Sequence, residues 1–366
     1  MRLKSLDVFR GATIAGMILV NTPGSWSAVY PPLRHADWHG CTPTDLVFPF
    51  FLFIVGVSVW FAFSKFDHEL NKSSAGKIIK RTILIFLIGF LLHYFPFYNK
   101  PIDHLRIMGV LPRIALAYGL GSLICLSVKD FKKLAGLGIL MLLGYWALLR
   151  WGVDSGYYTL EDNLVRKVDL FLFGANHLWQ GKGIAFDPEG LLSTLPAVVT
   201  VMMGYLTGAI LQKSATQNLA VQRMVLGGVS SIILALIWSF WFPINKSLWT
   251  SSFVLYTGGI AMLVLALCYW IIDIKKWQGW TFPFVVFGSN ALFVYLLSIL
   301  WVKIYFLIKI PGDDGTPQNA YNFIYSEWFK PVFGAMNGSL LFALAHIAVF
   351  WLILLFLYKR KIFIKV

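Results

Sequence analysis

Long apolar stretches dominate this chain and constrain its fold more than any other feature. A helix of about 20 apolar residues is long enough to cross a bilayer. Ten runs of roughly this kind are separated by shorter polar segments, at about 8–22, 44–64, 82–98, 107–128, 134–150, 191–211, 225–241, 250–272, 283–302 and 331–357. The sequence therefore predicts an all-α polytopic membrane protein with about ten transmembrane helices.

The overall composition excludes the two other common classes of protein. Only 13% of the 366 residues are charged, whereas a soluble globular domain has about a quarter. A disordered chain is excluded because 58% of the residues are hydrophobic and 17% are aromatic. The net charge of +14 is compatible with a nucleic-acid partner or an anionic membrane surface, so the positions of the charges must decide between them.

The distribution of Lys and Arg predicts the orientation in the membrane, because cytoplasmic loops are enriched in both. If Met1 is cytoplasmic, the inside segments hold 18 basic and 4 acidic residues, and the outside segments hold 11 of each. Both termini are therefore predicted to be cytoplasmic. The excess positive charge faces an anionic leaflet, and we expect no nucleic-acid partner. The three cysteines lack metal-ligand spacing, and we expect no metal.

Two outside loops, 22–43 and 151–188, are longer than a connection requires, which is typical of functional loops. His35 lies in the first of them, fourteen residues after Asn21 and ten before Asp45. A carboxylate can hold the tautomer of a histidine, and an amide can donate to an oxyanion. These three residues therefore form a catalytic hypothesis, against the alternative of a solvated loop histidine. His39 is a second candidate, and the residues alone do not choose between the two histidines.

Charged residues inside the apolar runs need a reason, because each costs roughly 2.5–3.5 kcal/mol on insertion scales. Asp45 opens the second run four residues before Pro49, and Arg113 follows Pro112 in the fourth. We expect Asp45 and Arg113 to pair, either as a structural ion pair or as part of a polar site. The two prolines are expected to kink their helices and open a pore.

Two further polar positions lie in the apolar runs. Arg10 is three residues after Asp7 at the inner end of the first run. It is either an interfacial snorkelling residue or a partner for a phosphate arriving from the cytoplasm. Asn290 lies within the ninth run and either joins helices through its amide or contacts a ligand.

The segment before the sixth run ends in Asp-Pro-Glu-Gly, which contains Asp187 and Glu189. Together with Trp179, these carboxylates are expected to bind a sugar, with the aromatic ring against the sugar face. The alternative is a turn and helix start, which the same four residues favour.

Several motifs, in order along the whole chain, resemble the transmembrane heparan-α-glucosaminide N-acetyltransferase family. They are Leu-Asp-Val-Phe-Arg-Gly at 6–11, Val-Asn at 20–21, His-Ala-Asp-Trp-His-Gly at 35–40, Thr-Asp-Leu-Val-Phe-Pro-Phe-Phe-Leu-Phe-Ile-Val-Gly at 44–56, Gly-Val-Leu-Pro-Arg-Ile at 109–114, Asp-Pro-Glu-Gly at 187–190, Asn-Ala-Leu-Phe-Val-Tyr at 290–295 and Tyr-Lys-Arg-Lys-Ile-Phe at 358–363. The block around His35 is highly specific.

The resemblance implies a single transmembrane acyltransferase domain over 1–366. Its members move an acetyl group from cytosolic acetyl-CoA to the amino group of a terminal glucosamine across the membrane. The active histidine falls on His35 and its partner asparagine on Asn21, and Asp45 and Arg113 also fall on family positions. Where family members may carry a histidine eight residues after the asparagine of the ninth run, this chain has Ser298. We expect acetyl-CoA to be bound by Arg10, Arg113, Asn290 and Ser298.

Several alternatives stay open at this point. The chain lacks the luminal domain of eukaryotic members, so the resemblance implies a bacterial inner-membrane form with its site towards the periplasm. A homodimer is compatible with the resemblance. His35 either deprotonates the amine in one ternary complex or is itself acetylated. The rival functions are a transporter of amino sugars or oligosaccharides and a non-catalytic membrane scaffold.

Overall fold

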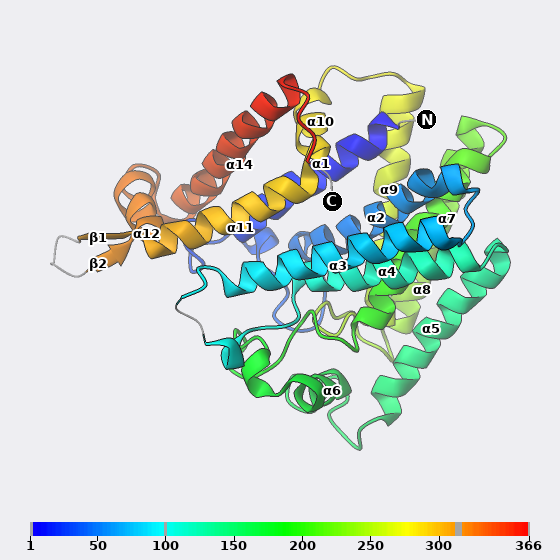
Figure 1. Ribbon diagram of the computed structural model, residues 1–366, viewed down its shortest axis with the longest axis horizontal. Coiled ribbons are helices and arrows are strands. Elements are labelled where there is room, and N and C mark those ends of the chain that lie inside the picture. The colour runs from blue at the N-terminus through cyan, green and yellow to red at the C-terminus, as the bar shows by residue number, and fades with distance from the viewer. Residues whose placement is uncertain (1–2, 99–100, 312–316, 365–366) are drawn as a thin grey trace.

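The computed structural model describes residues 3–98, 101–311 and 317–364, and helices make up most of it (Figure 1). The long helices are α1 (Lys4–Asn21), α2 (Val47–Phe63), α3 (Lys72–Tyr94), α4 (Val110–Ser127), α5 (Phe131–Trp151), α7 (Thr194–Lys213), α8 (Gln217–Trp238), α9 (Ser251–Cys268), α11 (Ala291–Leu307) and α14 (Ala335–Lys359). The shorter ones are α6 (Leu164–Phe173), α10 (Phe282–Ser289), α12 (Ala320–Ile324) and α13 (Lys330–Phe333). Strands β1 (Lys309–Pro311) and β2 (Pro317–Asn319) form an antiparallel hairpin in which Ile310 pairs with Gln318.

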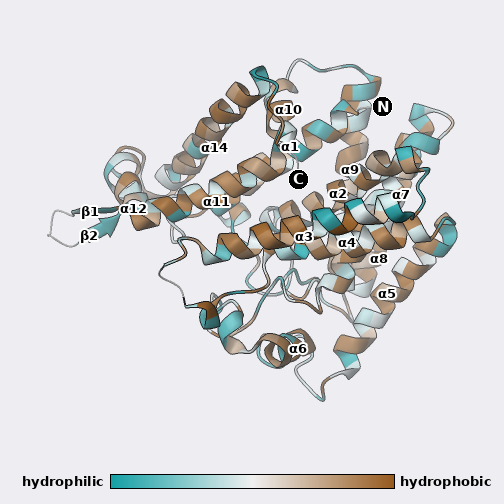
Figure 2. Ribbon diagram, in the orientation of Figure 1, coloured by the Kyte–Doolittle hydropathy of each residue, from teal (hydrophilic) through white to brown (hydrophobic). Residues whose placement is uncertain are grey.

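The predicted all-α membrane fold is confirmed, and each of the ten predicted runs overlaps a helix. Among the described residues, seven helices are long and apolar enough to cross a membrane, or eight if the bent pair α10–α11 is one span. The number of described helices that are long and apolar enough to cross a membrane is thus lower than the ten predicted. Helices α1 and α3 account for the difference, because their charged residues, among them Arg10 and Lys77, make them more polar. Figure 2 shows the apolar residues along the helices and the hydrophilic ones mainly at their ends.

The two predicted proline kinks are wrong, for a local reason. Pro49 and Pro112 each occupy the third position of their helix, α2 and α4. A proline in the first turn removes an N–H group that has no partner within the helix, so it does not break the helix. The break lies at Asn290 instead, where α10 and α11 meet at an angle of 80°.

Glycines allow the central helices to pack with their backbones close together. A Cβ atom on Gly56 of α2 would lie 2.0 Å from the Val201 carbonyl oxygen of α7, and one on Gly204 would lie equally close, 2.0 Å, to the Phe53 oxygen. Small residues at helix interfaces permit this approach in membrane proteins. Helix α2, which follows the Asp45 segment directly, is therefore tightly fixed against its neighbour.

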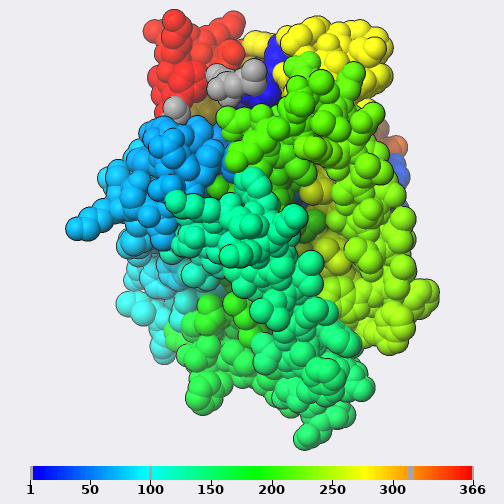
Figure 3. Space-filling model, turned by 90° about the vertical axis from the view of Figure 1, so that its right-hand side faces the viewer, coloured from blue at the N-terminus to red at the C-terminus, as the bar shows by residue number. Residues whose placement is uncertain are grey.

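At one end of the bundle the helix connections interlock, and we call residues 22–43, 95–98, 101–109, 152–193 and 239–250 the loop layer. Gly40 N donates to Ile244 O at 2.7 Å, Trp38 Nε1 donates to Tyr158 O at 2.7 Å, and Lys182 Nζ donates to Asp37 O at 2.6 Å. The layer includes α6, which forms within the predicted 151–188 loop. In Figure 3 the α6 end of the molecule lies opposite the end of α14, drawn in red.

Candidate active site

His35 and Asp45 form a hydrogen-bonded pair in and below the loop layer, as the sequence predicted from their spacing. His35 Nδ1 lies 2.6 Å from Asp45 Oδ1. The Asp45 side chain is 1% exposed, whereas that of His35 is 44% exposed. Because a carboxylate only accepts hydrogen bonds, the ring hydrogen lies on Nδ1 and donates to Asp45. This leaves Nε2 as the nitrogen that can take up a proton.

The chain around Asp45 folds so that its second carboxylate oxygen is also held. Pro43 begins a short 3-10 turn, Pro43–Leu46, with Thr42 as its N-cap and Asp45 at its third position. The backbone N–H and the hydroxyl of Thr42 each donate to Asp45 Oδ2 at 3.0 Å, as does the backbone N–H of Ala36. This reciprocal capping box fixes the carboxylate, and the carboxylate in turn fixes the ring of His35.

Lys246 is a member of this site that the sequence analysis missed. Its Nζ lies 3.3 Å from Asp45 Oδ1 and 3.1 Å from His35 Nδ1. An ammonium and a ring N–H are both donors, so the attractive partner of Lys246 is the carboxylate. Lys246 lies in the connection between α8 and α9, where the buried Asn245 accepts from Leu248 N at 2.8 Å. No motif marks this lysine in the sequence.

Two cavities meet at His35. The wide one, of about 680 Å³, opens in the loop layer and is lined by Trp26, Trp38, Trp179, Arg106 and Lys182 among others. The narrow one, of about 130 Å³, lies between α1, α2, α4 and α11 and is mostly apolar. His35, Glu189 and Lys246 line both. A group in either cavity therefore has access to the same imidazole.

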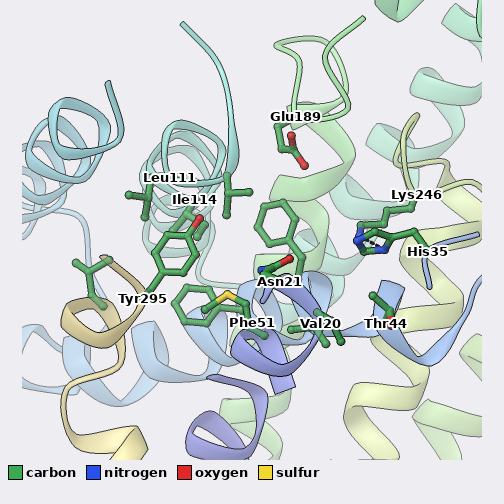
Figure 4. A pocket seen from close by; sticks show the side chains of 15 residues that line it. Val20, Asn21, His35, Thr44, Phe51, Leu111, Ile114, Glu189, Lys246 and Tyr295 are labelled. Atoms are coloured by element: carbon green, nitrogen blue, oxygen red, sulfur yellow. Dashed lines mark hydrogen bonds between the residues drawn. The ribbon is translucent and has the colours of Figure 1, made fainter. Parts of the chain in front are cut away.

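Asn21, the last residue of α1, lines the narrow cavity together with His35. Figure 4 shows His35 and Lys246 at one side of this cavity, Tyr295 and Leu111 at the other, and Asn21 between them. The structure thus brings Asn21, His35 and Asp45 into one region, as predicted. The amide of Asn21 is placed to donate to a group in the narrow cavity.

A second carboxylate network surrounds Asp187 and Glu189. Arg106 donates from Nε and Nη2 to the two oxygens of Asp187 at 2.8 and 2.7 Å, and from Nη2 to Glu189 Oε2 at 2.6 Å. Asp187 is fully buried and lines neither cavity at His35, so the sugar contact by Asp187 stays a prediction that this position does not favour. Glu189 lines both cavities, as its predicted role requires. Two acidic residues in one outside loop indicate that a cationic partner is needed nearby, but nothing in the sequence identifies that partner as Arg106.

Charge stabilises this network. Burial alone would lower the pKa of Arg106, but the hydrogen bond to Asp187 and the charge of Glu189 outweigh burial and raise that pKa. The guanidinium is therefore permanently charged, and it holds both carboxylates in place. The turn favoured by Asp-Pro-Glu-Gly is present as well, because Gly190 N donates to Asp187 O at 3.0 Å.

Arg113 does not pair with Asp45, which corrects a second prediction. Its guanidinium is fully buried, donates to Gly190 O at 3.0 Å and to Ser193 Oγ, and lies 5.1 Å from the Trp249 ring centroid. From α6, Asp169 accepts from Leu191 N at 2.9 Å. Arg113 and Asp169 therefore hold the turn after Glu189 from two sides, and Arg113 lines neither cavity at His35.

The other residues expected to bind acetyl-CoA have partners within the protein. Asn290 is 1% exposed, donates to Ile362 O at 3.1 Å and accepts from Ile364 N at 2.7 Å. Ser298 donates to Tyr295 O within its own helix at 2.8 Å. Their polar groups are engaged within the protein and they line neither cavity at His35, so their contact with acetyl-CoA stays a prediction. Arg10, at the far end of α1, contacts Asp7 and Ser58.

Two predicted residues remain, Trp179 and His39, and they differ in their position relative to the cavities. Trp179 lines the wide cavity. His39 lines neither cavity, and its Nδ1 faces Asn245 Nδ2 at 3.4 Å. Burial lowers the pKa of His39. Of the two candidate histidines, only His35 has both a carboxylate partner and a cavity.

The arrangement contains the groups that acyl transfer needs. A proton acceptor, an oriented carboxylate, a nearby ammonium and an amide donor surround the point where the two cavities meet. Within residues 3–98, 101–311 and 317–364, no group of three or more His, Cys, Asp or Glu side chains has the geometry of a metal site.

Comparison with known proteins agrees with the sequence motifs. Residues 2–239 match a family model described as heparan-alpha-glucosaminide N-acetyltransferase, catalytic. The chain is 29% identical over 351 residues to the human heparan-alpha-glucosaminide N-acetyltransferase, covering 81% of this chain and 52% of the relative. It is 28% identical to the mouse protein, covering 81% of this chain and 53% of that relative. The chain thus spans about half the length of the curated relatives it matches.

Proposed function

Because the chain belongs to the heparan-α-glucosaminide N-acetyltransferase family, we propose that it transfers an acetyl group from acetyl-CoA to the amino group of a glucosamine-type sugar. The observation that carries this proposal is the position of His35, where the wide and the narrow cavity meet. An acyl transfer between two substrates needs one base that both can reach. The acceptor occupies the wide cavity, and the acetyl thioester occupies the narrow one.

The wide cavity suits an amino sugar. Trp26, Trp38 and Trp179 provide aromatic faces for a pyranose ring, and Glu189 provides negative charge for its ammonium. Arg106 binds Oε2 of Glu189, and no hydrogen bond to Oε1 occurs among the described residues. That oxygen is the one we assign to the acceptor.

In the direct route, His35 Nε2 takes a proton from the sugar ammonium, and the freed amine attacks the thioester carbonyl carbon. Asn21 donates to the oxyanion that develops. The carbon–nitrogen bond forms in this attack, and it becomes an amide bond when the carbon–sulfur bond breaks. The nitrogen releases its second proton to solvent, and the sulfur leaves as CoA thiol with the proton that His35 gives back. Asp45 keeps the ring hydrogen on Nδ1 throughout, so that Nε2 stays available. Two cavities at one imidazole support a ternary complex rather than an acetylated enzyme.

The charge distribution supports the rest of the proposal. The described segments at the end opposite the loop layer carry most of the excess positive charge, so we place that end in the cytoplasm. The His35 site then faces outwards, towards the periplasm if the membrane is a bacterial inner membrane. Acetyl-CoA enters from the inside, and we assign one of its phosphates to Arg10.

Transport is the second candidate, because broken helices, such as α10–α11, occur in transporters. The deciding experiment supplies the purified protein with acetyl-CoA and glucosamine and measures the release of free thiol. N-acetylglucosamine, whose amine is blocked, serves as the control and should release none. Vesicles holding the protein are tested in parallel for glucosamine uptake. Uptake without thiol release would replace the transferase proposal with a transporter.

A further inference from the structure

A basic cavity of about 360 Å³ lies at the end of the bundle opposite the loop layer, between the ends of α2, α3 and α4. We call it the inner basic cavity. Lys65, Lys77, Lys80 and Arg81 all line it, and no acidic residue does. Within the described part of the chain, none of these four cations forms an ion pair with a carboxylate. A concave surface with four cations and no anion is suited to an anionic ligand.

Aromatic rings position three of these cations. Lys65 Nζ and Lys77 Nζ lie 5.3 and 5.2 Å from the centroid of the same ring, that of Phe66. The Arg81 guanidinium lies 4.9 Å from the ring centroid of the buried Tyr118. Two ammonium groups at one ring repel each other, and an anion between them would relieve that repulsion. A guanidinium held beside a ring keeps N–H groups that can donate to a phosphate.

The remaining residues that line the inner basic cavity are mostly apolar. Some of them share a helix face with residues of the narrow cavity at His35. Ala62 lies eleven residues after Phe51 of the narrow cavity. Eleven residues are about three turns, so the two lie on one face of α2, about 16 Å apart along the axis. On α4, Tyr118 of the inner basic cavity lies about one turn from Ile114 of the narrow cavity. Both cavities thus lie against the same faces of α2 and α4.

We propose that the inner basic cavity binds the phosphate end of an elongated amphiphile, with its phosphate between the Lys65–Lys77 pair and Arg81. Two ligands share this chemistry: the nucleotide end of an acyl thioester donor, and the headgroup of an anionic phospholipid. The first source rests on the proposed function, and the second does not. In both cases the apolar part of the ligand extends along α2 towards the narrow cavity.

The test compares two double variants with equal loss of charge on the same end of the molecule. Lys77→Gln/Lys80→Gln removes two cations of the cavity. Lys132→Gln/Lys133→Gln is the control, because both lysines are exposed on α5 and do not line the cavity. The probes are adenosine 3′,5′-bisphosphate, by calorimetry, and phosphatidylglycerol retained after delipidation, by native mass spectrometry, with phosphatidylcholine as the neutral lipid.

We expect at least one anionic probe to bind the wild type and to lose about tenfold or more in affinity in the Lys77/Lys80 variant only. Loss of the bisphosphate identifies the donor, and loss of phosphatidylglycerol alone identifies the lipid. Lys77→Arg/Lys80→Arg should restore binding. The proposal is overturned if neither probe binds, or if the control variant loses as much. Binding is measured without turnover, so this result does not depend on whether the chain transfers acetyl groups.

Discussion

Two carboxylates of the site region, Asp45 and Asp187, are almost equally buried but have different roles. Each has both oxygens hydrogen-bonded, Asp45 to His35 and the Thr42 turn, and Asp187 to Arg106. The partner makes the difference. Arg106 directs its bonds to two acids and closes the network, whereas the half-exposed ring of His35 keeps a second nitrogen for chemistry. The chemical use of a buried acid is thus determined by what its partner leaves available.

The largest expected effect is a loss of activity when His35, the partner of Asp45, is replaced. His35→Ala should lower the rate of thiol release about 10³-fold, because the proton acceptor is lost. Its unfolding midpoint in detergent should stay close to that of the wild type, since the ring is half-exposed. His39→Ala is the matched control and should retain activity. If His35→Ala keeps more than a tenth of the rate, His35 is not the base.

The next largest effect is on stability and concerns Arg106, Asp187 and Glu189, which we call the closed network. Arg106→Gln leaves Asp187 and Glu189 without their cation, and removal of one partner from a buried ion pair typically costs about 3–5 kcal/mol. We expect a clear fall in the thermal unfolding midpoint. Lys129→Gln removes a cation from the exposed pair with Glu69, whose side chains are 71% and 51% exposed, and should cost less than about 1 kcal/mol. Equal midpoints for the two variants would contradict the structural role of Arg106.

A pH dependence of stability is expected from Asp169, which accepts a hydrogen bond from Leu191 N in the turn after Glu189. Burial, with a contribution from the charge of Asp187, raises the pKa of Asp169 to about 7, against about 3.9 in an unfolded chain. Between these values the folded protein binds a proton that the unfolded chain has released. The free energy of unfolding should therefore fall as the pH rises from about 4 to 7.

Asp169→Asn should remove this dependence and stabilise the protein above pH 7 by a few kcal/mol, since each pKa unit corresponds to about 1.4 kcal/mol. The amide oxygen can still accept from Leu191 N. Thermal unfolding at pH 5 and pH 8 measures the change, with the exposed Asp154→Asn as the control. A variant with the same slope as the wild type would show that Asp169 is ionised across this range.

A smaller effect is expected at Lys246, which shares Asp45 with His35. Lys246→Gln removes the ammonium that lies 3.3 Å from Asp45 Oδ1 and helps to hold this carboxylate beside His35. The rate of thiol release should fall about tenfold, because the carboxylate then orients the imidazole less firmly. Lys246→Arg should restore most of the rate. An unchanged rate in Lys246→Gln would remove this lysine from the site.

The smallest effect distinguishes the outward-facing acid of the closed network from its buried one. Glu189→Gln should raise the KM for glucosamine about threefold to tenfold with little change in kcat, because it removes an attraction for the ammonium. Inhibition by glucose, which has no amine, measures the loss of any other contact and should not change. An unchanged KM would remove Glu189 from the acceptor site.

Sequence reasoning succeeds here where the determinants are local or periodic. Apolar runs of sufficient length predict the helices, and the short spacing from His35 to Asp45 predicts their contact. The turn chemistry of Thr-Pro-Thr-Asp then holds the carboxylate in place locally.

It fails where a partner comes from a distant segment. Lys246 is 211 residues from His35, and Arg106 is 81 residues from Asp187. Nothing local to either cation selects its acid. Arg113 is wrongly paired for the same reason, since depth along a helix does not fix which way a side chain points. The prolines mislead because the helix starts lie closer to them than the apolar runs suggest.

The bend at Asn290 has a consequence for how the protein is made. Its amide is satisfied by backbone groups of Ile362 and Ile364, which are 72 and 74 residues further along the chain. In an apolar environment an unpaired amide is costly. While the ribosome is still producing α14, the bend between α10 and α11 therefore lacks its partner. Helices α10, α11 and α14 must therefore settle together after synthesis.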